Sequence, residues 1–173
     1  MKTKLVTAVC VMSVFSLFAQ GTIDFKDDST ALVKGMPPGE TCVVGLWWAP
    51  VGTTDPVAFT FLPSSRTVVM GNGLFQGGIQ TINEVAGGAA VALQVRGWDA
   101  ASASWDMARI RGESAILTYT TGNPNGFPIP GDPGSLMDAG FKGLTLSVVP
   151  EPSTIALGLI GLAGLLVSRR RRQ

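Results

Sequence analysis

The stretch Thr41-Cys-Val-Val-Gly-Leu-Trp-Trp48 is rich in β-branched and aromatic residues and is closed by Ala49-Pro50. Such residues fit the pleated, half-buried surface of a sheet, and a following proline is a typical end to the run. Trp47 and Trp48 are neighbours, so their side chains point to opposite faces of a strand. The stretch therefore predicts a strand, in which one tryptophan is exposed if only one face of the sheet is buried.

The segments on either side repeat this pattern. Thr22-Ile-Asp-Phe-Lys26 alternates strictly, which puts Ile23 and Phe25 on one face. Clusters of glycine and proline separate the apolar runs. Further strands are predicted at residues 57–62, ended by Pro63, and at 67–70, 74–82, 89–98, 105–111, 115–120 and 144–149. The sequence therefore predicts an all-β domain at residues 20–149, an antiparallel β-sandwich with an immunoglobulin-like layout.

One part of this domain, residues 122–140, holds four prolines and five glycines. Such a composition hardly permits a regular element, and long loops are uncommon inside compact domains. We expect a Pro/Gly-rich surface loop before a last edge strand. A flexible stalk toward the C-terminal segment is the alternative.

The N-terminal segment has the pattern of an export signal. Lys2 and Lys4 precede a nonpolar run at residues 5–18. A basic start followed by a short apolar run is typical of a secretory signal peptide. We expect residues 1–19 to be this signal peptide, cleaved after Ala19 or alternatively after Gly21. An uncleaved N-terminal anchor is the competing interpretation.

The C-terminal segment joins three features in a short space. Prolines at 150 and 152 keep the chain around Glu151 extended and accessible to a processing enzyme. The uncharged run at residues 153–168 is 16 residues long, whereas a spanning helix needs about 20, so we expect a marginal transmembrane helix, with its apolar part at residues 155–167. A basic stop follows, formed by Arg169, Arg170, Arg171 and Arg172. Arginines stay on the cytoplasmic side, which places the preceding domain outside that membrane.

In order and spacing, Pro150, Glu151 and Pro152, the apolar run and the arginines resemble the PEP-CTERM sorting signal. This resemblance covers residues 150–173 and implies recognition by an exosortase, a membrane-embedded enzyme of Gram-negative bacteria that make exopolysaccharide. It also implies transient anchoring in the inner membrane. An ordinary tail anchor and a buried helix are the alternatives. Shorter stretches at 19–25, 93–99 and 111–114 resemble segments that recur in small exported PEP-CTERM proteins without an assigned activity.

Charge and cysteine content narrow the function of residues 20–149. They hold 7 basic and 11 acidic residues, a net charge of −4, so binding to nucleic acid has no support. Cys42 is their single cysteine, which excludes an intrachain disulfide and leaves burial alone to stabilise the fold. We expect Cys42 to be a small core residue.

The chain contains no histidine, which excludes a Ser-His-Asp or Cys-His nucleophile and removes the usual nitrogen ligands of zinc. Asp24, Asp27 and Asp28 offer oxygen atoms to calcium, but their spacing matches no full loop motif, so a solvated acidic turn is expected. We therefore predict no catalytic residues, no metal and no cofactor.

One pair of motifs suggests contact with sugars. Trp98-Asp99 and Trp105-Asp106 flank a short loop at residues 100–104, which a hairpin would close. The two rings would then form a stacking platform, with both acids accepting hydrogen bonds from sugar hydroxyls. In the alternative, both tryptophans cover the edge of the core. Together with Glu113, these acids could also hydrolyse a glycosidic bond.

Three functions follow in order of preference. The first is a non-enzymatic exported protein of the cell envelope or extracellular matrix, sorted by an exosortase and associated with exopolysaccharide or biofilm. The second is a carbohydrate-binding module that uses exposed tryptophans. The third is a carboxylate glycosidase.

Overall fold

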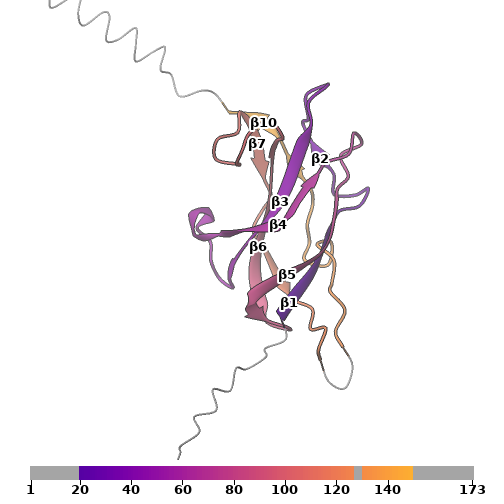
Figure 1. The fold of residues 1–173 in the computed structure, drawn as a ribbon, viewed down its shortest axis with the longest axis vertical. Coiled ribbons are helices and arrows are strands. Elements are labelled where there is room, and N and C mark those ends of the chain that lie inside the picture. Colours follow the sequence, from indigo (N-terminus) through magenta and orange to yellow (C-terminus); the bar gives the residue numbers. More distant parts are fainter. Residues whose placement is uncertain (1–19, 127–129, 150–173) are drawn as a thin grey trace, which may run out of the picture.

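A computed structural model describes residues 20–126 and 130–149, and this part of the chain is built almost entirely from strands (Figure 1). The strands are β1 (Gln20–Lys26), β2 (Val33–Lys34), β3 (Cys42–Pro50), β4 (Thr60–Val68), β5 (Gln76–Ala86), β6 (Ala90–Asp99), β7 (Ile110–Glu113), β8 (Leu117–Thr120), β9 (Leu144–Thr145) and β10 (Ser147–Val148). The helical content of the described residues is one short 3-10 helix, η1 (Pro56–Ala58). The predicted all-β class is confirmed.

Two long strands, β3 and β6, form the centre of the largest sheet. They pair antiparallel from Cys42 opposite Asp99 to Pro50 opposite Val91. β3 also pairs with β4, while β6 pairs with β7 and β8, and β7 pairs with β10. Two smaller sheets are the antiparallel pair β1–β5 and the parallel pair β2–β9. The immunoglobulin-like sandwich layout stays a prediction.

Both faces of the β3–β6 pair are covered. The main core on one face includes Ile23, Phe25, Val44, Leu46, Ile82, Leu93 and Val95. The smaller core on the other face includes Val43, Trp47, Phe59, Ala92 and Trp98. Trp47 and Trp48 therefore point to opposite faces, as predicted, but Trp47 is buried and Trp48 packs half-buried against the main core.

Two buried serines complete the hydrogen bonding of this central pair. β4 bulges where it passes Leu46, and the Ser65 hydroxyl accepts the Leu46 N–H at 2.7 Å. On the other edge of the β3–β6 pair, between the end of β7 and the start of β8, the Ser114 hydroxyl accepts the Val95 N–H at 3.0 Å. Leu46 and Val95 are opposite each other in the register, so both interruptions occur at one level of the sheet. Each hydroxyl supplies an acceptor where the neighbouring strand offers no carbonyl, at the bulge of β4 and at the gap between β7 and β8.

Several predicted strand boundaries are wrong. The strands predicted at 57–62 and 67–70 form the single strand β4, which begins only after η1. Pro63 does not end a strand: it lies inside β4, in the bulged part of an edge strand, where the missing N–H removes no ladder bond. The strand predicted at residues 105–111 begins only at Ile110, because a longer loop follows Asp99.

The Pro/Gly-rich segment lies along β1. Gly122 and Thr22 exchange two backbone hydrogen bonds, of 3.1 and 2.8 Å, and the Asp24 N–H donates to the Gly134 carbonyl at 3.1 Å. Leu136 is fully buried in the main core. Its described residues therefore cover the edge of β1 that β5 leaves free, and they do not form a separate stalk.

The predicted signal peptide at residues 1–19 and the predicted helix at 155–167 lie outside the described residues. Between residues 20 and 149, leaving out 127–129, the structure contains no helix long and apolar enough to cross a membrane.

Asp27 joins the end of β1 to the start of β5. Its Oδ1 accepts the Phe75 N–H at 2.7 Å, while Oδ2 is buried without a hydrogen-bond partner. Burial raises the pKa of Asp27 to about 6, against the lowering effect of the bond from Phe75. Asp28 behaves in the opposite way, because the bond from the Thr30 hydroxyl lowers its pKa.

Replacing Ser65 by alanine should destabilise the domain by about 1–3 kcal/mol, because the buried Leu46 N–H loses its acceptor. Urea unfolding of residues 20–149 measures this change in the free energy of unfolding. Ser29→Ala, at an exposed serine in the turn after β1, is the control and should stay within about 0.5 kcal/mol of the parent. Equal effects of the two substitutions would show that the Ser65 hydroxyl does not maintain the bulge.

The raised pKa of Asp27 should make the domain less stable as the pH rises. The folded state holds the Asp27 proton up to a pKa of about 6, and the unfolded state only to about 3.9. The stability that protonation adds is complete below the unfolded value and is lost as the pH rises through the folded one. Asp27→Asn should therefore raise the melting temperature at pH 7.5, with a gain that shrinks toward pH 4.5. Asp28→Asn should show no such gain, and a gain common to both variants would contradict this role of burial.

Candidate functional site

The predicted sorting residues, Pro150, Glu151 and Pro152, and the arginines at 169–172 lie outside the described residues. The chain directly before them is well defined. In β10, Ser147 lies opposite Arg111 and Val148 opposite Ile110 of β7. The Val149 N–H then donates to the Arg109 carbonyl at 2.8 Å. The chain is therefore held in the sheet up to the residue before Pro150.

The residues of β9 and β10 and Leu146 between them differ in burial. Leu144 and Leu146 are buried in the main core, and the Leu146 N–H donates to the Lys34 carbonyl at 2.8 Å. Both residues of β10 are exposed, with Val148 at 59%. In Figure 1, β10 lies at the upper end of the molecule and β1 begins at the lower end. The sorting segment thus follows a shallow edge strand at one end of the domain.

The structure does not form the predicted stacking platform from Trp98 and Trp105. Trp98 is only 2% exposed. Its ring lies edge-on to those of Trp47 and Phe61, with centroid distances of 5.8 and 6.2 Å. The ring of Trp98 is therefore part of the smaller core and has no face free for a sugar.

Asp99 is also buried and closes the loop after β6. Its Oδ1 accepts hydrogen bonds from the Ser102 N–H and hydroxyl at 2.9 and 2.8 Å, and its Oδ2 accepts the Ile110 N–H at 3.2 Å. Burial tends to raise the pKa of Asp99, but these bonds together outweigh it and hold the pKa below its usual range. The carboxylate stabilises the loop and does not face a ligand.

Trp105 and Asp106 do reach a cleft, which has a volume of about 330 Å³. Trp105 is half-buried and Asp106 is exposed. The cleft is lined by the aromatic side chains of Trp47, Phe59 and Trp105 and by the charged ones of Arg96, Asp106 and Glu113. This Trp105 cleft brings together half of the predicted platform, Trp105 and Asp106, and two of the three acids of the glycosidase hypothesis, Asp106 and Glu113.

Arg96 is the centre of the Trp105 cleft, and the sequence analysis missed it. It is 6% exposed, and its guanidinium carbon lies 5.0 Å from the Trp47 ring centre and 4.7 Å from that of Trp105. Burial lowers the pKa of Arg96, while Glu113 acts to raise it. The signal in the sequence was a basic residue in the middle of an apolar strand, two residues before Trp98.

Hydrogen bonds fix the guanidinium of Arg96 in this position. Its Nη2 donates to the Pro56 carbonyl at 2.6 Å, and its Nε donates to the Gln94 Oε1 at 2.9 Å. Arg111 stacks on the same indole, with its guanidinium carbon 4.6 Å from the Trp105 ring centre. Because two arginines already stack on Trp105, the charged groups of the cleft are better placed than the ring to bind a ligand.

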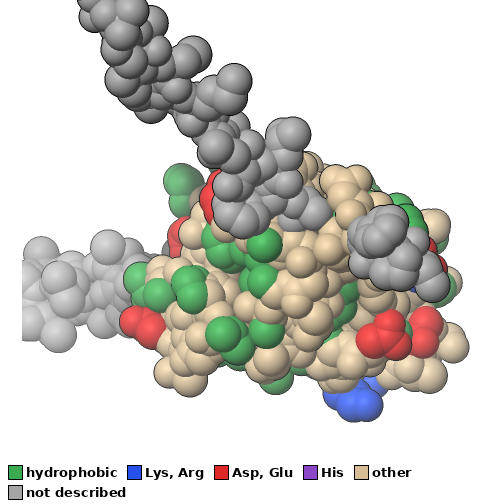
Figure 2. Space-filling model, turned by 90° about the horizontal axis from the view of Figure 1, so that it is seen from below, with side chains coloured by type: hydrophobic (Ala, Val, Ile, Leu, Met, Phe, Trp, Pro, Cys, Tyr) green, Lys and Arg blue, Asp and Glu red, His purple; other side chains and the backbone are tan. Residues whose placement is uncertain are grey.

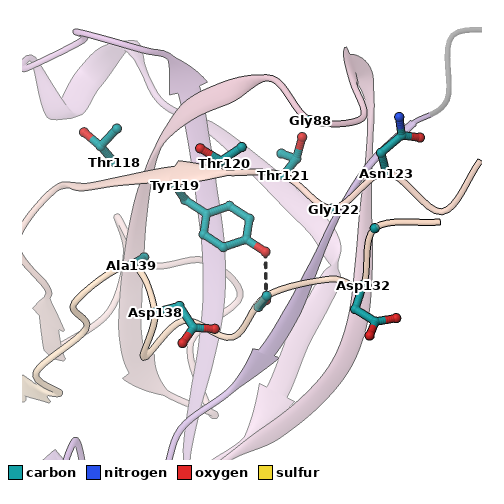
Figure 3. Close-up of a pocket in the computed structure, with 12 residues that line it drawn as sticks. Gly88, Thr118, Tyr119, Thr120, Thr121, Gly122, Asn123, Asp132, Asp138 and Ala139 are labelled. Atoms are coloured by element: carbon teal, nitrogen blue, oxygen red, sulfur yellow. Dashed lines mark hydrogen bonds between the residues drawn. The ribbon is translucent and has the colours of Figure 1, made fainter. Parts of the chain in front are cut away.

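A second hollow of about 470 Å³ lies between β8 and the Pro/Gly-rich loop (Figure 3). Exposed Thr118 and Thr120 line it from the strand, and Asp132 and Asp138 line it from the loop. The Tyr119 hydroxyl donates to the Gly134 carbonyl at 2.8 Å, and burial raises the pKa of Tyr119 to about 12. No lysine, arginine or exposed aromatic ring is among the described residues that line it. This polar groove can form hydrogen bonds but cannot stack on a sugar ring.

The acidic residues in and just after β1 do not converge. Asp24 forms an ion pair with Lys26, and Asp27 and Asp28 bind separate backbone groups. In the part of the chain that the structure describes, no three His, Cys, Asp or Glu residues are placed to hold a metal ion. Cys42 is a free, buried thiol, and burial raises its pKa.

Figure 2 shows the end of the domain where β1 begins. Apolar side chains form small separate groups on this face, and acidic side chains occur at several places among polar ones. Basic side chains are rare there. This face therefore has no broad basic surface of the kind that binds nucleic acid.

Comparisons with known proteins identify the C-terminal segment alone. A search of curated proteins gives no match, and a search of solved structures gives none. A family model described as the PEP-CTERM protein-sorting motif matches residues 148–172. The chain therefore carries a C-terminal PEP-CTERM protein-sorting motif, which implies a protein that is exported to the cell envelope and sorted by an exosortase.

Proposed function

We propose that this chain is a non-enzymatic exported protein that an exosortase releases from a transient anchor in the inner membrane. It then acts at the cell surface or in the extracellular matrix, in association with exopolysaccharide or biofilm. The observation that carries the proposal is the sorting motif, which begins in the last strand of a folded all-β domain.

In this proposal the chain has three parts. Residues 1–19 start export and are removed. Residues 20–149 fold as a β-sandwich with an immunoglobulin-like layout. The helix at 155–167 stops in the membrane against the arginines, and the chain is cut near Pro150-Glu151-Pro152.

The proposal assigns no catalysis to the domain. The chain lacks histidine, and the Asp99 carboxylate is occupied by three hydrogen bonds. Of the three acids in the glycosidase hypothesis, Asp106 and Glu113 remain in the Trp105 cleft. Both lie beside the guanidinium of Arg96, which is 3.7 Å from Glu113 between Nε and Oε2.

The Trp105 cleft supports a second candidate function, the binding of carbohydrate. Asp106 and Glu113 supply acceptors for sugar hydroxyls, and Val57 adds an exposed apolar group. Few well-placed polar groups beside apolar side chains are typical of small-molecule sites. The domain would then hold the exopolysaccharide directly.

Processing gives the test of the first function. The intact mass of the protein from its native host should correspond to a chain that begins near Gln20 and ends near residues 150–152. Replacing Pro150, Glu151 and Pro152 by alanine should leave export intact and retain the tail, so the protein accumulates in the inner membrane. An extracellular protein that still carries residues 169–172 would contradict this mechanism.

Titration with oligosaccharides tests the second function. Binding in the Trp105 cleft should change the intrinsic tryptophan fluorescence of residues 20–149 in a saturable way, because Trp47 and Trp105 line it. Asp106→Asn should weaken that binding about tenfold or more, since a charged acceptor is lost. Asp132→Asn, in the polar groove, is the matched control and should leave it unchanged. If no oligosaccharide on a glycan array binds saturably, the second function is wrong, and the role of the domain in the matrix is structural.

A further inference from the structure

We propose that β10 is a latch: while it is paired with β7 it withholds the sorting motif, and the exosortase cuts the form in which β10 has left the sheet. This inference rests on the proposed function, because it supposes cleavage near Pro150-Glu151-Pro152. It adds a folding equilibrium of the substrate that controls the reaction.

The sorting motif and the folded domain overlap. The family match begins at residue 148, and Val148 is the second residue of β10. Val149 also belongs to the match, and its N–H donates to the Arg109 carbonyl at 2.8 Å. The first residues of the motif are therefore sheet residues, and no linker separates the two.

This overlap limits how far the motif can reach. An extended chain advances about 3.3–3.6 Å per residue, so Pro150 lies within one residue length of a backbone atom held by β7. Enzymes that recognise extended segments need their backbone groups free to pair. Freeing residues 147–149 adds about 10 Å of chain between the domain and Pro150. A membrane-embedded enzyme would then reach the motif without meeting the domain.

The latch can open while the rest of the domain stays folded. β10 pairs with β7 at two register positions, and both of its residues are exposed. The preceding Leu146 is buried, and its N–H donates to the Lys34 carbonyl at 2.8 Å. Local opening is easiest where few apolar contacts and exposed backbone bonds hold an element. The boundary between the closed core and the opening strand therefore falls between Leu146 and Ser147.

β7, the strand with which β10 pairs, stays in place during this opening. Arg109 Nη2 lies 3.3 Å from Glu40 Oε1, and Arg111 Nη1 donates to the Asp106 carbonyl at 2.8 Å. β7 is also paired with β6 through Arg111 opposite Trp98. Only the β10 side of the latch is thus held weakly.

A covalent lock tests the proposal in the full chain, expressed in its native host. Ser147 and Arg111 are direct antiparallel partners, and such pairs have Cα distances compatible with a disulfide. The double variant Ser147→Cys with Arg111→Cys should oxidise after export, because the compartment outside the inner membrane is oxidising. Alkylation of free thiols followed by mass measurement selects the oxidised molecules, and Cys42 does not compete because it is buried.

The locked protein should lose its tail at least about tenfold more slowly than the parent, since cleavage follows the population of the open form. Dithiothreitol should restore cleavage of the double variant. The reduced double variant is the reference for the lock, because it carries the same two substitutions, and the parent with and without dithiothreitol controls for the reagent. Processing of the oxidised double variant at the parent rate would overturn the latch while leaving the proposed function intact. A parent that keeps its tail, as the alanine variant of residues 150–152 should, would instead overturn the proposed function.

Discussion

This domain depends on one constraint. In the middle of a sheet that is buried on both faces, every backbone N–H group needs a hydrogen-bond partner from the protein. β3 and β6 lie between the main core and the smaller core, so water cannot satisfy their N–H groups. At the level of Leu46 and Val95 the pairing is irregular on both sides, because β4 bulges beside Leu46 and neither β7 nor β8 pairs with Val95. The hydroxyls of Ser65 and Ser114 supply the missing acceptors there, which lets β4 bulge and lets two short strands share one edge of β6.

Much of the fold was predictable because it depends on local alternation. The apolar runs around β1, β3, β6 and β8 reflect strands with defined inner faces, and the structure places them within one to three residues of their predicted bounds. Pro63 was misread because proline is excluded from central strands but tolerated in a bulged edge strand, and edge position is a tertiary property. β2 and β9 are two residues each and pair in parallel across a long separation, which no local pattern records.

The candidate sites were likewise predictable only where they depend on local sequence. The sorting motif is read from sequence because its prolines, its apolar run and its arginines are contiguous in the chain. Only part of the predicted sugar platform lies at the surface, because the prediction assumed a tight hairpin. Asp99 instead folds the loop back by accepting hydrogen bonds from Ser102 and Ile110, which buries one tryptophan and leaves the other beside Arg96. The contact between Arg96 and Trp105 could not be predicted, because it depends on how the strands and the loop after β6 are placed in space.

The first and last strands, β1 and β10, place the two termini of the described chain at opposite ends of the domain (Figure 1). Gln20 pairs with Ala86 at the end where β1 begins, and Gly88 beside it lines the polar groove, while β10 lies at the other end (Figure 1). A chain fixed by its C-terminal segment would carry that groove toward the end away from its point of attachment. The face in Figure 2, with several acidic side chains and few basic ones, would then be what an approaching macromolecule meets first. Anionic polymers would be kept at a distance from this tip, and neutral or amine-bearing ones would not.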